Sequence, residues 1–182
     1  SIDTYKAKTA KFALENGFEM VNDITGGESD KLLDVVAKYK AKIIIMHMKG
    51  IPETMQKKPT YSNLLIELLD FFEERIQKAI KAGISSKDII LDPGLGFGKR
   101  IVDNDIIINS INTFKSLGYP LLVGASRKSF LQTDNNEPGE RLSSTIAVNT
   151  LAALNGADII RVHDVNEHIN VRTILNRIMS SK

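Results

Sequence analysis

The run Lys42-Ile43-Ile44-Ile45-Met46 decides the fold class of this chain. From Ile43 onward every residue is apolar, so neither face of a strand built from this run suits contact with water. Strands that are apolar on both faces are typical of parallel sheets covered by other elements. Segments with apolar residues at helical spacing flank the run, over 31–40 and 62–82. The run therefore predicts a buried strand in a parallel α/β sheet.

The same alternation continues outward in both directions. We expect strands ending at Ile2 and over 20–21, 42–46, 88–91, 121–123 and 157–162. We expect helices over 5–16, 31–40, 62–82, 103–117, 143–154 and 165–179, and a long loop from 124 to about 141. Six strand–helix units in succession predict either an open doubly wound sheet or a closed (β/α)8 barrel. No linker or break in composition divides the chain, so 1–182 is one domain.

Polar side chains follow every expected strand. They are Asp3, Asn22, Asp23, His47, Asp92, Ser126, Arg127, Lys128, Arg161 and His163. In a barrel the carboxyl ends of all strands open onto one face, so these groups would converge on one cup. An open sheet would spread them along an edge. The pattern favours the barrel, with carboxylates and an amide after the early strands and cations after the last two.

Single motifs in this set also have simpler interpretations. Asp3 could cap the next helix, Asn22-Asp23 could belong to a turn, and His47 could be a buried core histidine. The glycine-rich run ending at Lys99 does not have the spacing of a nucleotide-binding loop, because Arg100 follows the lysine. The shared position at strand ends, rather than any one motif, indicates a site.

Composition excludes several classes of function. The chain has 182 residues, 24 Lys and Arg against 22 Asp and Glu, a net charge of +2 and no Cys. The basic residues are scattered, which predicts no nucleic-acid partner. No apolar run approaches the roughly 18 residues that a membrane span needs, so we expect a cytoplasmic protein that does not bind membranes. Without cysteine there is no catalytic thiol and no thiolate zinc site.

Taken together, the motifs resemble the dihydropteroate synthase family of pterin-binding (β/α)8 barrels, and the order and spacing match over the whole chain. The matching blocks are Ser1-Ile2-Asp3-Thr4, Asn22-Asp23-Ile24, Met46-His47-Met48-Lys49-Gly50, Leu91-Asp92-Pro93-Gly94-Leu95-Gly96-Phe97-Gly98-Lys99, Gly124-Ala125-Ser126-Arg127-Lys128-Ser129, Glu140-Arg141-Leu142 and Arg161-Val162-His163-Asp164-Val165.

The resemblance implies a transferase of folate biosynthesis. Such an enzyme joins 4-aminobenzoate to 6-hydroxymethyl-7,8-dihydropterin diphosphate and releases diphosphate and 7,8-dihydropteroate. It is a sulfonamide target, its partners are these small-molecule substrates, and it is usually a homodimer. Magnesium is the expected cofactor, bound with the substrate diphosphate, and the resemblance implies no metal ligand in this chain.

The resemblance also assigns residues. The implied pterin contacts are Asp3, Asn22, Met46, Asp92 and Lys128; the diphosphate contacts are Arg161 and His163; and the aminobenzoate contacts are Phe97 and Ser129. Asp3 and Lys128 are the implied catalytic residues, with Asp3 stabilising positive charge on the pterin. Ser129 lies where we expect a helix to begin, which would offer free backbone N–H groups to a carboxylate.

The family has two further βα units before the segment that matches here. We therefore expect this chain to be the C-terminal three quarters of the barrel, with about six of the eight units, and N-terminally incomplete. Two alternatives remain at this point. One is a pterin-dependent methyltransferase of the same superfamily, and the other is a fragment that binds pterin and catalyses nothing.

Overall fold

The computed structural model describes residues 1–133 and 137–181; residues 134–136 of the expected long loop lie outside that range. The described strands are β1 (Ile2–Asp3), β2 (Met20–Asp23), β3 (Lys42–Met46), β4 (Ile89–Asp92), β5 (Leu122–Val123) and β6 (Ile159–Ile160). The helices are α1 (Ala7–Glu15), α2 (Asp30–Tyr39), α3 (Leu64–Lys81), α4 (Ile101–Asn109), α5 (Ile111–Phe114), α6 (Leu142–Leu154) and α7 (Val165–Met179).

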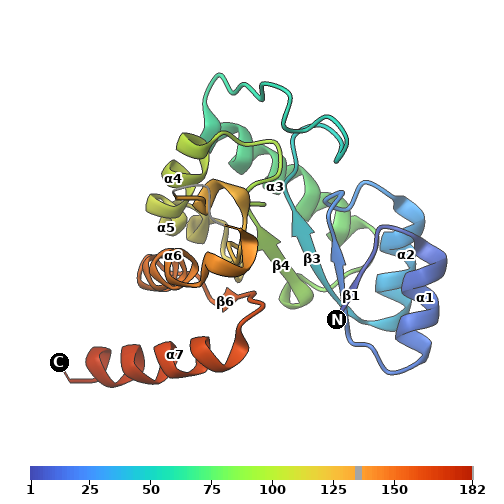
Figure 1. Ribbon diagram of the computed structural model, residues 1–182. Coiled ribbons are helices and arrows are strands. Elements are labelled where there is room, and N and C mark those ends of the chain that lie inside the picture. Colours follow the sequence, from blue (N-terminus) through green and yellow to red (C-terminus); the bar gives the residue numbers. More distant parts are fainter. Residues whose placement is uncertain (134–136, 182) are drawn as a thin grey trace.

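The strands are parallel and follow one another in chain order. β1, β2, β3 and β4 form one sheet, β5 pairs with β6, and a parallel bridge from Leu91 to Leu121 joins the two sets. Within the described residues the order shows no reversal, whereas a doubly wound sheet reverses at its switch point. The arc also curls, because Arg161 after β6 forms an ion pair with Asp3 of β1. The barrel interpretation is confirmed, and Figure 1 shows this arc of strands.

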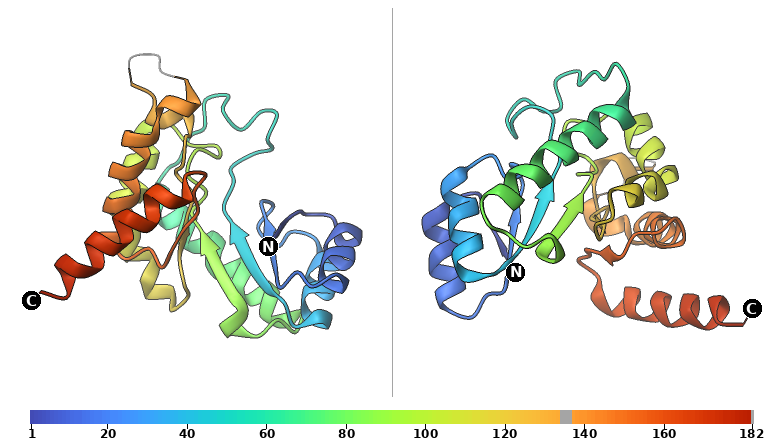
Figure 2. Two further views of the ribbon diagram at one scale, coloured as in Figure 1. Left: turned by 60° about the horizontal axis from the view of Figure 1, so that its bottom comes forward. Right: turned by 180° about the vertical axis from the view of Figure 1, so that it is seen from behind.

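The helices cover the outer face of this arc. Outward-facing strand residues such as Ile43, Ile45 and Leu91 belong to a core that also contains Leu68 and Phe72 of α3. Figure 2 shows α3 lying across the back of the strands. A smaller cluster of Ile44, Ile90 and Leu122 fills the inner face. The apolar run around Ile44 is therefore buried on both sides, as its composition predicts.

Local signals set the ends of the helices. Ser29 caps α2 by accepting a hydrogen bond from Leu32 N at 3.3 Å, and Asn63 caps α3 by accepting from Ile66 N at 3.3 Å. α2 ends at Lys40, which takes a left-handed conformation with φ of 50°. These helices lie within two residues of their expected bounds at each end.

Two expected elements differ from the structure. The helix expected over 103–117 begins at Ile101 and breaks at Ser110, where φ and ψ are −110° and 19°. It begins early because Asp103 accepts from Arg100 N at 2.8 Å and so lies inside the first turn. It breaks where Asn109 and Ser110, both weak helix formers, adjoin. The strand expected over 157–162 is only Ile159–Ile160, because β5 offers it just two residue partners.

α7 contacts the rest of the structure differently from the other long helices. It extends away from the arc in Figure 1, and all of its residues are described, yet none is buried. Its exposed apolar residues include Ile169, Ile174 and Ile178. None of the helices in the described residues has the length and apolarity to cross a membrane.

Candidate functional site

Asp3, Asn22 and Arg161 meet at one side of the rim formed by the carboxyl ends of the strands. Asn22 Nδ2 donates to Asp3 Oδ1 at 2.9 Å, and the Arg161 guanidinium donates to the other Asp3 oxygen. Asn22 is 2% exposed, and within the described residues its Oδ1 has no hydrogen-bond partner. Asp3 does not cap a helix, because the N-cap of α1 is Lys6. Buried polar atoms are normally hydrogen-bonded, so Asn22 Oδ1 is a candidate acceptor for a donor of a ligand.

Asp92 is the most buried carboxylate of the rim. It ends β4, is 5% exposed and pairs in register with Met46, which is also buried. Asp92 Oδ1 accepts a hydrogen bond from Gly94 N at 2.7 Å. Burial raises the pKa of Asp92 above its ordinary value, and the nearby charges of Lys128, Lys99 and Arg161 oppose that rise.

Lys128 brings positive charge to the same region. Its ammonium donates to Leu95 O and lies 4.5 Å from the centroid of the Phe97 ring. Burial lowers the pKa of Lys128 to about 8, while the negative charge of Asp92 acts in the opposite direction. Phe97 and Lys128 therefore form one contact pair, with the aromatic ring beside the cation.

Arg161 and His163 are exposed members of the rim. His163 Nδ1 lies 2.9 Å from Ser126 Oγ, and the same hydroxyl accepts from His163 N at 3.2 Å. Ser126 thus orients His163. Ser129 is exposed and begins a 3-10 helix of only three residues, Ser129–Leu131. A helical turn does begin at Ser129, as expected, but it is a 3-10 turn and not an α-helix, and binding of a carboxylate by its N–H groups stays a prediction.

Three polar residues at strand ends do not join the rim, contrary to the expectation that all would converge. Asp23 accepts from Thr25 N at 2.9 Å and from Gly27 N at 2.8 Å, so it holds a turn. Arg127 forms an ion pair with Asp164 at the start of α7. His47 packs its ring against Phe71 of α3, with centroids 4.8 Å apart. His47 and Asp23 point outward because adjacent residues of a strand face opposite sides.

Lys99 is a buried charged residue to which the sequence analysis gave no role. It is 3% exposed, and its Nζ lies 2.9 Å from His47 Nδ1 and 3.1 Å from Phe97 O. Burial lowers the pKa of Lys99 to about 7, and that of His47 to about 2, so His47 is neutral. No local pattern marks this pair, because 52 residues separate its members.

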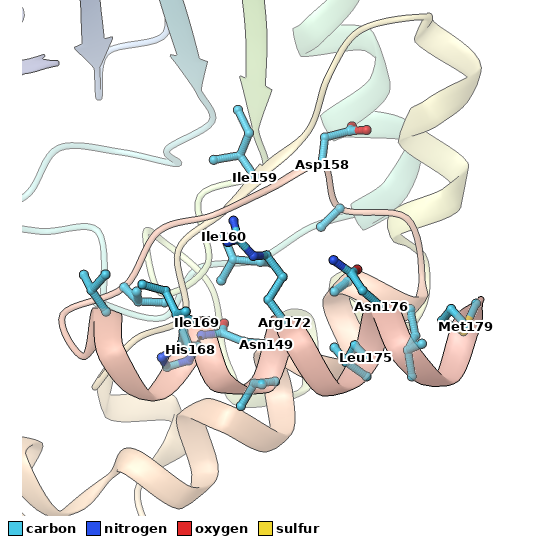
Figure 3. A pocket seen from close by; sticks show the side chains of 16 residues that line it. Asn149, Asp158, Ile159, Ile160, His168, Ile169, Arg172, Leu175, Asn176 and Met179 are labelled. Carbon is cyan, nitrogen blue, oxygen red and sulfur yellow. Dashed lines mark hydrogen bonds between the residues drawn. The ribbon is translucent and has the colours of Figure 1, made fainter. Parts of the chain in front are cut away.

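The site is an open rim, and a groove lies elsewhere in the structure. Figure 3 shows that groove, which has a volume of about 610 Å³ and runs between β6, α6 and α7. None of the residues expected at the site lines it. Among the described residues there is no group of three or more His, Asp or Glu side chains placed to hold a metal.

A parallel barrel arc with buried acceptors and cations gathered at the carboxyl ends of its strands defines the class: a (β/α)8-type protein whose candidate site lies at the face where such barrels build their active sites. Residues 1–163 match the family model described as pterin binding enzyme, and the chain belongs to that family.

Relatives and solved structures agree with this family. A curated relative from a Synechocystis species, named dihydropteroate synthase, is 45% identical over 168 residues, which are 91% of this chain and 58% of the relative. The Yersinia pestis dihydropteroate synthase with a sulfonamide drug gives a TM-score of 0.96 at 36% identity, covering 99% of this chain and 66% of that one. The Thermus thermophilus enzyme with 4-aminobenzoate gives 0.92 at 30% identity, covering 96% and 68%.

Proposed function

We propose that the protein to which these residues belong is a dihydropteroate synthase. It condenses 4-aminobenzoate with 6-hydroxymethyl-7,8-dihydropterin diphosphate and releases diphosphate. One observation carries the proposal: the rim sets the buried acceptors of Asn22 and Asp92 beside the cations Lys128 and Arg161. The names and bound molecules of the relatives above support the same reaction.

The acceptors suit the aminopyrimidine edge of a pterin. That edge presents an amino group and a ring N–H, which are donors, and a buried carboxylate accepts such a pair. Asp92 would take these donors on the oxygen that Gly94 N does not occupy, and Asn22 Oδ1 would take another. Met46 supplies an apolar wall, and the Lys128 ammonium donates to the ring carbonyl and a ring nitrogen.

The cations suit the diphosphate. The guanidinium of Arg161 is planar and always charged, so it binds phosphate oxygens with two parallel hydrogen bonds, and His163 donates beside it. When the methylene carbon–oxygen bond breaks, its electron pair leaves with the diphosphate. The positive charge that remains spreads into the dihydropterin ring, and the Asp3 carboxylate stabilises it. A diphosphate on Arg161 also replaces the ion pair that now joins Arg161 to Asp3.

The arylamine completes the reaction. Its nitrogen attacks the methylene carbon, forms the new carbon–nitrogen bond and loses a proton to solvent. Phe97 would contact the aromatic ring of 4-aminobenzoate, and Ser129, which is exposed, would face its carboxylate. This path needs neither a protein nucleophile nor a strong base.

Cofactor, assembly and location are further parts of the proposal. Magnesium would be bound together with the substrate diphosphate, where it would supply positive charge to the leaving group; the described residues include no cluster of His, Asp or Glu that would hold it by themselves. A homodimer is supported by the exposed apolar side chains of α7, among them Ile174 and Ile178. A cytoplasmic location is supported by the absence of cysteine and by the substrates, which are small metabolites.

The test is condensation by the purified full-length protein. We expect dihydropteroate and diphosphate to appear in equal amounts when both substrates are present. Lys128→Met should lower kcat/KM by about a hundredfold, because a buried charged donor is lost. Lys87→Met, at an exposed lysine before β4, serves as the matched control and should leave the rate unchanged.

Three outcomes would contradict the proposal. Diphosphate release without arylamine incorporation would indicate a hydrolase. Methyl transfer from methyltetrahydrofolate to a corrinoid would indicate the methyltransferase alternative, for which the cations of the rim have little use. Calorimetric binding of the pterin without turnover would indicate a protein that binds pterin only.

A further inference from the structure

The Lys99 ammonium occupies a fully protein-lined position behind the rim. Its three N–H donors have three acceptors within reach: His47 Nδ1 at 2.9 Å, Phe97 O at 3.1 Å and, more weakly, His47 O at 3.4 Å. An ammonium has only donors, so His47 Nδ1 accepts and its Nε2 carries the ring proton. Burying this charge is costly unless it is hydrogen-bonded. The lysine is therefore tied to the end of β3 on one side and to the loop after β4 on the other.

The loop between Gly94 and Lys99 lies directly against β3. A Cβ on Gly94 would stand 2.0 Å from His47 O, and one on Gly98 would stand 2.3 Å from Lys49 O. Gly96 N donates to Asn104 Oδ1 at 2.7 Å, which secures the loop from the side of α4. The backbone of this loop is thus held close to the chain that follows β3. Lys99 donates a hydrogen bond to the carbonyl of Phe97, whose ring lies at the rim.

We propose that Lys99 is a positioning residue for the arylamine half of the reaction, which rests on the function proposed above. By holding Phe97 O against the end of β3, it sets where the Phe97 ring stands relative to the Lys128 ammonium, 4.5 Å from the ring centroid. Lys99 itself contacts no substrate. Its rigid support comes from the neutral His47, whose ring packs edge-on against Phe71 of α3.

None of the three acceptors of Lys99 belongs to a residue proposed to contact the pterin. Asp92 and Asn22 are held by their own strands and by Gly94 N and Asp3. Loss of the Lys99 bonds should therefore disturb the aminobenzoate side of the rim more than the pterin side. If Lys99 only stabilised the fold, its substitution would disturb the aminobenzoate side and the pterin side of the rim to the same extent.

Steady-state kinetics of the full-length Lys99→Met protein test the separation. We expect the KM for 4-aminobenzoate to rise about tenfold, the change that losing one charge-assisted hydrogen bond produces. The KM for the dihydropterin diphosphate should stay within about twofold. Lys87→Met is the matched control, because it removes an exposed lysine at the opposite ends of the strands. An equal rise in both KM values would overturn the proposal.

A double-mutant cycle asks whether Lys99 acts through Phe97. In a Phe97→Leu background, Lys99→Met should raise the aminobenzoate KM by only about twofold, because residues that act as a unit are not additive. If the KM of the double variant for 4-aminobenzoate rose by the product of the two single-variant increases, the proposal would be contradicted.

Amide hydrogen exchange gives a readout that does not depend on activity. Lys99→Met should speed exchange at Phe97 N, which donates to Gly94 O at 3.0 Å, by about tenfold. Exchange in β2 should not change, which excludes general unfolding. Unchanged exchange at Phe97 N would refute the role of Lys99. If instead the unaltered protein makes no dihydropteroate, the proposed function fails, and the exchange result alone decides whether Lys99 holds the loop.

Discussion

The two halves of the rim are built differently. The acceptor half rests on β2, β3 and β4, which pair over four residues at each contact, and its members Asn22 and Asp92 are at most 5% exposed. The cation half rests on β5 and β6, which pair over only two residues. The Arg161 side chain is 53% exposed there.

This difference follows the chemistry that each half is proposed to perform. Hydrogen bonds to a neutral heterocycle gain strength from a dry, rigid setting, because water competes with them poorly there. A diphosphate carries enough charge to be held by exposed, adjustable cations, and burying those cations without a ligand would cost stability. The acceptor half is therefore preorganised by the core, whereas the cation half is completed by its ligand.

The largest expected effect contrasts two buried aspartates, Asp92 of the acceptor half and Asp23 on the outward face of β2. Asp92→Asn should lower kcat/KM by about a hundredfold, because it replaces an acceptor charge with a donor that faces the donors of the substrate. The fold should persist, since burial already raises the pKa of Asp92 and disfavours its charge. Steady-state kinetics and urea unfolding measure the two effects.

Asp23→Asn is the matched variant on the outward face of β2. It should cost about 1–3 kcal/mol of stability, because each Asp23 oxygen accepts a backbone N–H of the turn that follows. The KM for the pterin substrate should stay unchanged. If Asp23→Asn lowered kcat/KM and Asp92→Asn lowered only the stability, the assignment of Asp92 to the inward face and Asp23 to the outward face would be wrong.

A smaller effect is expected from Arg161→Ala in the cation half. The KM for the dihydropterin diphosphate should rise about tenfold and that for 4-aminobenzoate much less, because only the diphosphate uses the guanidinium. Stability should hardly change, since the exposed pair with Asp3 contributes little. Arg177→Ala, near the end of α7, is the control. Equal effects on both KM values would make Arg161 a structural residue and remove the contrast between the halves.

A separate effect concerns stability against pH. The pKa of Lys99 is lowered to about 7 and that of Lys128 to about 8, both below the value of an unfolded lysine. Between these values and about pH 10 the unfolded chain binds more protons, so stability rises with pH, by up to about 1.4 kcal/mol per unit for each group. Urea unfolding at pH 7, 8 and 9 measures the rise.

Variants separate the contributions of the two lysines. Lys99→Met should remove the rise between about pH 7 and 8 and about half of the slope above pH 8. Lys128→Met should leave the rise between about pH 7 and 8 and remove the other half of the slope above pH 8. A slope that neither variant alters would show that other groups control it. The result would also show whether Lys99, in the loop behind the rim, loses its proton at a lower pH than Lys128 of the rim.

Much of the fold was predictable from the sequence because it depends on local periodicity. The apolar run at 43–46 and the helical spacing over 62–82 predicted β3 and α3 within two residues at each end. The break at Ser110 was missed, because the apolar spacing from Ile107 through Ile111 to Phe114 continues across it. Periodicity reports which side faces the core and does not report whether each backbone hydrogen bond forms.

The candidate site was predictable only in part. Asp3, Asn22 and Asp92 lie at strand ends, as expected, whereas Phe97 and Lys128 lie in the loops that follow β4 and β5. The alternation of side chains along β2 and β3 could have separated Asn22 from Asp23 and Met46 from His47. The expectation that all strand-end groups converge ignored that alternation. The contact between Lys99 and His47 carried no local signal, because 52 residues separate them.

The sequence by itself determined the order of the described strands and of the helices between them, and it placed polar groups near the ends of the strands. Those features depend on residues a few positions apart. Only the tertiary structure decided that Asp3 meets Arg161 across 158 residues and that Lys99 meets His47 across 52. Such contacts depend on how strongly the sheet curls and how closely its loops approach, and both result from the packing of the whole arc.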